Sequence, residues 1–482
     1  MNSTGKIPRI IALFTLLCGA SVAEAQTATI NWTEQHQQIQ GFGAADQLGM
    51  FSGQYLTAAQ AQTFFSQTNG IGLSILREGI PDNASVPGNC GSVSSSCVPG
   101  AVLNNMQLAI AQNPNLKIFA TVFSPPASMK TNGSVNCSDN SGGGTLISSD
   151  YGQFATWMSN WIGSVESLYS ITPYAVSVQN EPEECESYDS SLLSSSEFDT
   201  FIKTNLQPTM ASAGQSAVKI MMPEPDVQSD LTGYAGSCMG DGSCSPYVGI
   251  VAVHNYDFGA ASSNPYSTSA QYWETEVSGC ALSATSANYA PCAYTGAMNP
   301  DGLYWAYNIW SWMTQANANA WVWWALIPYG GSGAYPNTGL MNPDGLTMPQ
   351  RLWAVGNYSK FIQPGYVRID ATANPRSGVY LSAFQDLPSG TVVIVAINST
   401  GSDVSQTFSI ANGPNFNSVM PWITSASLNL AQQSAISVSS NSFAYTLPAS
   451  SVTTFVGSSG SPGPAQSVVP DPPTDLVAVI GH

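Results

Sequence analysis

The chain has 482 residues and a net charge of −18, and only 8% of its residues are charged. This length exceeds one ordinary domain, but a (β/α)8 barrel uses about 250 residues and leaves room for a smaller second domain. The acidic balance excludes nucleic acid as an expected partner, because an acidic surface repels phosphate groups. A neutral polymer, recognised through hydrogen bonds and aromatic faces, is compatible with this composition.

The N-terminus has the pattern of a secretory signal peptide, residues 1–25. Two basic residues precede an apolar run from residue 10 to residue 18, and residues 23–25 form a small-x-small cleavage site. Cys18 is a candidate for lipidation, but the bulky Leu17 before it favours a secreted, extracellular product without a lipid anchor. No later segment reaches the roughly 20 apolar residues that span a bilayer, so no membrane association is expected.

Eight cysteines follow the signal peptide, and an even number in an exported chain favours disulfide bonds. The short gaps favour the pairs Cys90–Cys97, Cys238–Cys244 and Cys280–Cys292, which leaves Cys137–Cys185. Eight cysteines allow 105 pairings, so the connectivity stays open. With only three histidines and no Cys-x-x-Cys motif, neither a metal nor a cofactor is expected.

Eight apolar segments alternate with helical stretches, which predicts a (β/α)8 barrel in residues 39–357. The predicted strands are Ile39–Ala44, Gly72–Arg77, Lys117–Phe123, Tyr174–Gln179, Val218–Met222, Gly249–His254, Gln271–Thr275 and Ala320–Ala325. The clearest predicted helices are Leu56–Gln67, Tyr151–Tyr169, Ser195–Ala213 and Leu303–Ala316.

Residues 358–457 change to alternating apolar and polar runs with turn residues, which predicts an attached antiparallel β-sandwich. The mature N-terminus, residues 26–38, also has a strand pattern and is expected to join this side domain. The tail from residue 458 to residue 482 is rich in Ser, Gly and Pro, which is typical of a linker, and its end could begin a further module.

Two glutamates stand out because each closes an apolar strand of the predicted barrel. Glu181 follows the fourth strand and Glu276 ends the seventh, so both are expected at the barrel mouth, where (β/α)8 enzymes place catalytic groups. Two facing carboxyl groups are the requirement for glycoside hydrolysis. Glu274 is a rival of Glu276, since residues two apart in a regular strand share a face.

Other acidic residues have less specific interpretations. Glu183, Glu184 and Glu186 follow the first glutamate in a loop, where acidic side chains are usually only solvated. Asp46 and Glu78 are weaker candidates for contacts with substrate.

The motifs together resemble glycoside hydrolase family 30, and most closely its bacterial xylanase branch, over residues 36–457. The similar segments include Gln40-Gly41-Phe42-Gly43, Ser124-Pro125-Pro126, Ser177-Val178-Gln179-Asn180-Glu181-Pro182, Trp273-x-Thr275-Glu276, Pro364-Gly365-Tyr366-Val367-Arg368-Ile369-Asp370 and Val392-Val393-Ile394-Val395-Ala396-Ile397-Asn398. The resemblance implies a retaining mechanism with Glu181 as general acid/base and Glu276 as nucleophile. It also implies that Asn180 hydrogen-bonds the sugar 2-hydroxyl, although a capping amide is the alternative.

The resemblance assigns further substrate-binding residues around these carboxylates. Tyr256 would touch the nucleophile, and His254 would line the cleft. Trp324 would be the platform for a sugar ring, with Trp323 packed behind it. Arg77 would anchor the carboxylates, and a purely structural salt bridge is equally compatible with its position.

One loop departs from the relatives that cut glucuronoxylan, which carry an arginine pair after the eighth strand. Residues 325–333 contain neither arginine nor lysine, so the charge-assisted contacts that clamp a carboxylate are lost. We therefore expect no dependence on glucuronic acid branches, with Tyr329 left to form a weaker hydrogen bond. Residues 80–102 also differ from the bacterial branch, and substrate contacts on that side stay open.

The sequence thus predicts a secreted, monomeric, cofactor-free endo-β-1,4-xylanase that acts on plant cell-wall xylan. Two alternatives stay open. The first is a β-1,6-glucanase or galactanase of the same family. The second is a non-catalytic carbohydrate-binding protein, which the two intact carboxylates argue against.

Overall fold

The computed structural model describes residues 27–81, 86–140, 143–288, 296–329 and 338–459. The predicted signal peptide, residues 1–25, and almost all of the predicted linker tail lie outside these ranges. Within the described ranges, no helix combines the length and the apolar character that crossing a membrane requires.

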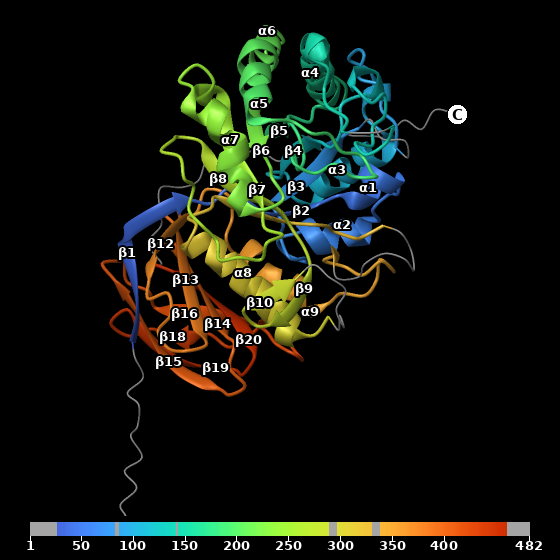
Figure 1. The fold of residues 1–482 in the computed structure, drawn as a ribbon. Coiled ribbons are helices and arrows are strands. Elements are labelled where there is room, and N and C mark those ends of the chain that lie inside the picture. The colour runs from blue at the N-terminus through green and yellow to red at the C-terminus, as the bar shows by residue number, and fades with distance from the viewer. Residues whose placement is uncertain (1–26, 82–85, 141–142, 289–295, 330–337, 460–482) are drawn as a thin grey trace, which may run out of the picture.

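The larger domain is a closed barrel of eight parallel strands (Figure 1). Its strands are β2 (Gly41–Ala45), β3 (Ile75–Ile80), β4 (Lys117–Val122), β5 (Ala175–Ser177), β6 (Lys219–Pro223), β7 (Val248–His254), β8 (Gln271–Val277) and β11 (Ala320–Trp323). Neighbours in sequence are neighbours in the barrel, and β11 pairs with both β8 and β2 to close it. Each strand overlaps one of the eight predicted segments, so the predicted barrel is confirmed.

The helices form the outer layer of the barrel, as Figure 1 shows. They are α1 (Gln47–Ser52), α2 (Ala58–Phe65), α3 (Gly100–Gln112), α4 (Tyr151–Tyr169), α5 (Ser195–Phe201), α6 (Gln207–Ser212), α7 (Leu231–Gly240), α8 (Leu303–Thr314) and α9 (Gln350–Ser359). Local sequence sets where they begin: Thr57 and Ser194 each form a capping box with a side chain three residues later. A π-helical turn, Ile202–Leu206, joins α5 to α6, so the predicted helix from residue 195 to residue 213 is one interrupted unit.

Alternation along the strands separates the barrel interior from the layer under the helices. Ile75, Phe119, Met221, Trp273 and Val322 belong to one buried cluster inside the barrel. Their neighbours along the strands pack outward against the helices in a larger core. The interior is therefore filled by side chains, and chemistry is confined to the rim of the barrel.

The smaller domain is a ten-stranded sheet that curls on itself below the barrel (Figure 1). Its strands are β1 (Thr27–Gln38), β12 (Val367–Ala371), β13 (Val379–Asp386), β14 (Thr391–Asn398), β15 (Val404–Ala411), β16 (Ser418–Thr424), β17 (Ala431–Gln432), β18 (Ile436–Ser437), β19 (Ser442–Leu447) and β20 (Ser451–Ser458). The N-terminal strand β1 lies between β12 and β15, antiparallel to the first and parallel to the second. All other pairs are antiparallel, so this domain is built from both ends of the described chain.

The two domains meet where α8 and α9 pack against the curled sheet. The indole N–H of Trp310 donates to the carbonyl of Leu381 at 2.8 Å, and Thr454 donates to the carbonyl of Asn357 at 2.7 Å. These buried bonds pair polar groups that would otherwise be costly at a domain junction.

Three of the four predicted disulfides are present: Cys90–Cys97, Cys137–Cys185 and Cys238–Cys244. The fourth predicted pair involves Cys292, which lies outside the described residues, and Cys280, which begins β9 (Cys280–Ser283). This strand pairs with β10 (Ser286–Asn288) in a separate hairpin.

Candidate active site

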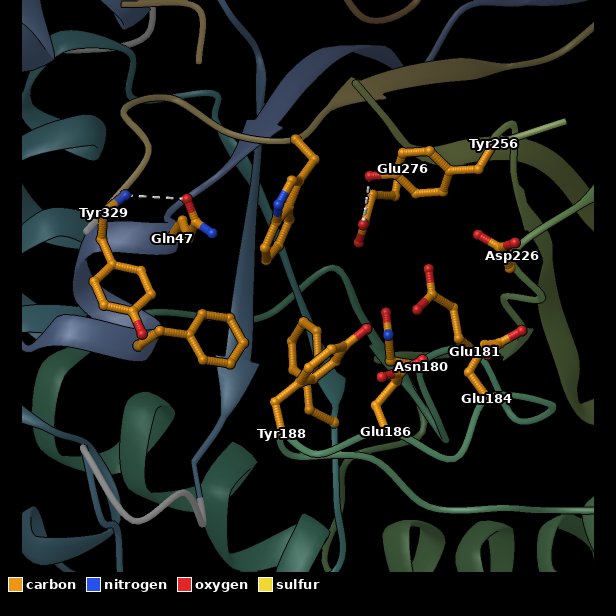
Figure 2. Close-up of a pocket in the computed structure, with 13 residues that line it drawn as sticks. Gln47, Asn180, Glu181, Glu184, Glu186, Tyr188, Asp226, Tyr256, Glu276 and Tyr329 are labelled. Carbon is orange, nitrogen blue, oxygen red and sulfur yellow. Dashed lines mark hydrogen bonds between the residues drawn. The ribbon is translucent and has the colours of Figure 1, made fainter. Parts of the chain in front are cut away.

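A cleft of about 550 Å³ lies at the barrel rim, at the carboxyl ends of the strands (Figure 2). Its lining residues are Gln47, Phe51, Phe123, Asn180, Glu181, Glu184, Glu186, Tyr188, Asp226, Tyr256, Glu276, Trp324 and Tyr329. Six of the eight predicted catalytic and substrate-binding residues are in this set. The exceptions are Arg77 and His254.

Glu181 reaches the cleft from the segment that follows β5. Its backbone has φ = +40°, in the left-handed region that a residue other than glycine rarely adopts. The backbone N–H of Glu181 donates to the carbonyl of Glu224 at 3.0 Å, which fixes this unusual conformation. Backbone outliers of this kind often occur at functional sites.

Glu276 reaches the cleft from β8, and both of its carboxylate oxygens are held. The Tyr256 hydroxyl donates to Oε1 at 2.8 Å, and the Arg77 guanidinium forms an ion pair with Oε2. A carboxylate oxygen of Glu181 lies within 4.8 Å of one of Glu276. The two carboxyl groups therefore face the same small volume, as Figure 2 shows.

A β-bulge in β8 decides which glutamate of this strand faces the cleft. Residues of β7 and β8 pair one for one as far as Val253 and Glu274, but His254 pairs with Glu276. The partner strand β11 shows the same extra residue of β8 between its own residues 321 and 323. Strand β8 therefore carries one more residue than either neighbour, at Thr275.

The bulge corrects the expectation that Glu274 and Glu276 share a face. Trp273 points into the barrel interior, so Glu274 points outward under the helices, paired across β11 with the outward-facing Trp321. The extra residue, Thr275, lets Glu276 point inward again. Glu274 has no exposed surface and is absent from the cleft lining.

A buried network lies behind the two cleft carboxylates and is centred on Arg77. Its guanidinium donates to Asn180 Oδ1 at 2.7 Å and lies 3.4 Å from Glu224 Oε1, in addition to its ion pair with Glu276. Thr121 donates to the other carboxylate oxygen of Glu224 at 2.9 Å. Burial raises the pKa of Glu224, but Arg77 and His254 outweigh it and bring this pKa down to about 2.

His254 ends β7 and contacts Glu181, with 2.9 Å between Nδ1 and Oε1. Its Nε2 lies 3.8 Å from Glu224 and 4.0 Å from Glu276. Burial lowers the pKa of His254, but the charges and hydrogen bonds of these three carboxylates hold it well above the usual value. The ring is therefore an imidazolium at neutral pH. One of its ring nitrogens and one carboxylate oxygen from each of Glu181 and Glu276 lie within 4.8 Å of one another.

The structure corrects four predicted substrate contacts. Arg77 and His254 have no exposed surface and lie behind the cleft wall, so they are screened from substrate. The expected anchoring of the carboxylates by Arg77 is present, as ion pairs with Glu224 and Glu276. Asp46 caps α1 by accepting the N–H of Gly49 at 3.1 Å, and Glu78 is fully buried next to it. Burial raises the pKa of Asp46 to about 6. Neither Asp46 nor Glu78 reaches the cleft.

Aromatic side chains form one part of the cleft wall. Trp324 follows β11 and lies edge-on to Phe51, with 5.9 Å between ring centroids, and near Phe123 at 6.1 Å. Trp323 points the other way and packs against Trp305 under the helices. Tyr329 is 43% exposed at the end of the cleft where Figure 2 also shows Gln47, whose side chain accepts the Tyr329 backbone N–H.

Acidic side chains gather at the other end of the cleft, beside Glu181 (Figure 2). Glu184, Glu186 and Asp226 line this end, and Glu183 lies behind it and accepts the backbone N–H of Asp226. Burial, followed by the charge of Glu181, raises the pKa of Asp226 to about 7. Burial raises the pKa of Glu183 to about 8.

Sequence reasoning missed Glu224 and Asp226, which flank Pro225 directly after β6. A signal was available, because these carboxylates follow a predicted barrel strand, as Glu181 does. Thr121 on β4 had no distinguishing signal, since a threonine in an apolar strand is common.

The closed barrel and the two carboxyl groups that face each other at its rim together define a class of protein: the (β/α)8 enzymes that cleave glycosidic bonds with two acidic residues.

Comparison with known proteins agrees with this class. The family model "Glycosyl hydrolase family 30 TIM-barrel domain" matches residues 102–300, and "Glycosyl hydrolase family 30 beta sandwich domain" matches residues 365–455. Glucuronoxylanase XynC of Bacillus subtilis (strain 168) is 30% identical over 472 residues, which cover 93% of this chain and 99% of that protein. The chain belongs to glycosyl hydrolase family 30 and is therefore a glycoside hydrolase.

Solved structures show the same relationship. The family 30 subfamily 8 xylanase Xyn30A from Clostridium acetobutylicum is 30% identical with a TM-score of 0.74, covering 90% of this chain and 100% of that one. The catalytic domain of family 30 xylanase C from Talaromyces cellulolyticus is 27% identical with a TM-score of 0.73, covering 89% and 99%.

Proposed function

We propose that this protein is a secreted, retaining endo-β-1,4-xylanase that cuts xylan without requiring glucuronic acid branches. The observation that carries the proposal is the approach of Glu181 and Glu276 oxygens to within 4.8 Å across the cleft. Retaining glycosidases hold their two carboxyl groups about 5 Å apart, whereas inverting enzymes need about 6.5–9.5 Å to admit a water. The short separation supports retention.

In this mechanism, a carboxylate oxygen of Glu276 attacks the anomeric carbon while Glu181 gives its proton to the glycosidic oxygen. The bond from carbon to that oxygen breaks, and the xylosyl unit becomes an ester of Glu276. Glu181 then takes a proton from water, whose oxygen attacks the same carbon and releases Glu276. The acid of the first step is thus the base of the second.

The surrounding charges support this division of roles. Arg77 and Tyr256 hold the two oxygens of Glu276 in one orientation, as a nucleophile requires. Among the buried groups, the cations of Arg77 and His254 offset the charges of Glu224 and Glu276.

Two further residues have positions that suit sugar binding. The Asn180 carbonyl oxygen accepts a hydrogen bond from Arg77, so its amide N–H groups remain for a substrate hydroxyl. Trp324 presents an aromatic face in the cleft wall, suitable for stacking on a pyranose ring.

Charge supports independence from glucuronic acid. Within the described residues, no arginine or lysine lines the cleft. Five acidic side chains do: Glu181, Glu184, Glu186, Asp226 and Glu276. The acidic lining repels an anionic branch, and residues 325–333, the loop that carries the clamp in relatives, contain neither arginine nor lysine. The xylan substrate itself is inferred from the relatives, which are named xylanases and glucuronoxylanase.

Mass analysis of products from glucuronoxylan, arabinoxylan and a β-1,6-glucan tests the proposal, with Glu276→Gln as inactive control. We expect neutral xylooligosaccharides of mixed length from both xylans. Products that each carry one glucuronic acid would contradict independence from the branch. Release only from the β-1,6-glucan would refute xylanase activity and favour the glucanase alternative.

A further inference from the structure

The β-bulge in β8 leaves backbone groups beside the proposed nucleophile that need hydrogen-bond partners. An extra residue interrupts the regular ladder between two strands and leaves backbone groups without their usual partners. The N–H of Val322 on β11 lies opposite this interruption, between the paired residues Trp321 and Trp323. Because Val322 is fully buried, its N–H requires an acceptor from within the protein.

Glu274 supplies that acceptor. Its Oε2 accepts the N–H of Val322 at 3.1 Å, and the backbone N–H of Glu276 faces the same carboxyl group. One side chain therefore connects the bulge, the neighbouring strand and the backbone of the proposed nucleophile. Thr275, the extra residue, contributes no hydrogen bond from its hydroxyl to any described residue, so it offers no substitute.

The chemical state of Glu274 suits this role. Burial raises its pKa well above the usual range, and nearby Glu276 adds to the effect. The group is therefore an uncharged carboxylic acid at neutral pH, and its carbonyl oxygen accepts hydrogen bonds. A glutamine side chain has the same shape and the same acceptor, whereas leucine has the size without the acceptor.

We propose that Glu274 is a positioning residue whose carboxyl group holds the bulge at Thr275 and thereby fixes the direction in which Glu276 points into the cleft. The inference rests on the proposed function, in which Glu276 is the nucleophile. Without the acceptor, the buried N–H of Val322 drives β8 and β11 to rearrange. A displacement of about 1 Å at a reacting group costs on the order of 100-fold in rate.

The test compares Glu274→Gln, Glu274→Leu and Glu274→Asp with the unmodified enzyme. The probe is 2,4-dinitrophenyl 2-deoxy-2-fluoro-β-xylobioside, which reports the first step alone. A carboxylate oxygen of the nucleophile bonds to the anomeric carbon, and 2,4-dinitrophenolate leaves with the bonding electron pair. Intact-protein mass gives the labelling rate constant and the binding constant separately, and peptide mapping gives the labelled residue.

We expect Glu274→Leu to lower the labelling rate constant and the kcat on xylan by about 10- to 100-fold, with binding and KM within about twofold. Glu274→Gln should keep at least about a third of both rates, because the acceptor is retained. Glu274→Asp should lower both rates as much as Glu274→Leu does, because the shorter aspartate side chain cannot span the bulge. If Glu274→Leu does not fold, the contrast between Gln and Asp carries the same test.

A matched control separates positioning from general core damage. Glu78 on β3 is also a fully buried carboxyl group, and its oxygens accept no hydrogen bond from the described residues. Glu78→Gln should therefore alter thermal stability without changing the labelling rate constant.

Two results would overturn the positioning role: labelling by Glu274→Leu at the unmodified rate despite a lower Tm, or an equal loss in Glu274→Gln. Failure of the proposed function is distinguishable, because the unmodified enzyme would then not be labelled at Glu276.

Discussion

The most informative perturbation of this site is Arg77→Met, which removes the cation shared by Glu224 and Glu276 while keeping an apolar side chain of similar length. Arg77 has no exposed surface and Glu224 has none either, so water cannot replace the lost charge. Breaking a buried ion pair from one side costs about 3–5 kcal/mol, because it leaves a charge without a partner.

The pKa of Glu224 gives a magnitude for the combined effect of its buried partners. Arg77 and His254 outweigh burial and bring the pKa of Glu224 from an ordinary 4.5 to about 2. At roughly 1.36 kcal/mol per pH unit, this difference corresponds to about 3 kcal/mol of stability. Because the pKa is lowered in the folded state, this stability is fully present above about pH 4.5 and is lost as the pH falls towards 2.

Urea unfolding followed by tryptophan fluorescence at pH 7 and at pH 3 measures this dependence. We expect Arg77→Met to be about 3 kcal/mol less stable at pH 7, and the difference to shrink at pH 3, where the freed carboxyl group takes up a proton. A difference that is absent at pH 7, or equally large at both pH values, would refute the reasoning.

Arg351→Met is the matched control for activity. Arg351 is equally buried and pairs with Asp301 at 2.8 Å, but it lies against Trp323 under the helices. It should lower stability while kcat stays within about threefold, whereas Arg77→Met should lower kcat by at least about 100-fold at a temperature where both variants are folded.

Three other predictions follow from the same geometry. Azide should restore turnover of an activated xyloside in both Glu181→Ala and Glu276→Ala. NMR should show a β-configured glycosyl azide from Glu181→Ala and the α-anomer from Glu276→Ala. The same anomer from both variants would contradict the assigned roles. Trp324→Ala, measured by calorimetry in a Glu276→Gln background, should bind xylohexaose about tenfold more weakly, whereas Tyr247→Ala outside the cleft should not. Burial raises the pKa of Glu183 to about 8, so the stability of the folded protein falls as the pH rises from 5 to 8. Glu183→Gln should therefore show a smaller decrease of Tm over this interval. An unchanged dependence of Tm on pH would refute this.

The barrel could be predicted because each strand is a short, buried apolar run that is visible without knowledge of its neighbours. The positions of Glu181 and Glu276 followed from the same runs, since barrel strands end at one rim. The disulfides Cys90–Cys97 and Cys238–Cys244 followed from their short separations, which favour pairing on chain length alone.

The bulge at Thr275 could not be predicted, because it exists only as a mismatch between β8 and its two neighbours. Nothing local to Trp273-Glu274-Thr275-Glu276 distinguishes a regular strand from one with an extra residue. The choice between Glu274 and Glu276 therefore depended on resemblance, and the structure supplies the physical reason.

The buried positions of Arg77 and His254 were unpredictable for a related reason. The predicted strands end at Arg77 and His254, and sequence alone places such residues at the rim without saying how deep they lie. Strand β3 continues to Ile80, three residues beyond Arg77. The burial of Arg77 and His254 depends on partners from other segments of the barrel: Asn180 and Glu276 contact Arg77, and Glu181 contacts His254.

The burial of Arg77 and His254 also determines how their positive charges act. A positive charge that lined the cleft would be screened by water and would attract anionic branches of the substrate. Buried behind the wall, Arg77 and His254 act at short range on Glu224, Glu276 and Glu181, while the surface that meets substrate carries only carboxylates as charged groups within the described residues. The same placement therefore orients the carboxylate pair proposed for catalysis and leaves the cleft without a partner for glucuronic acid.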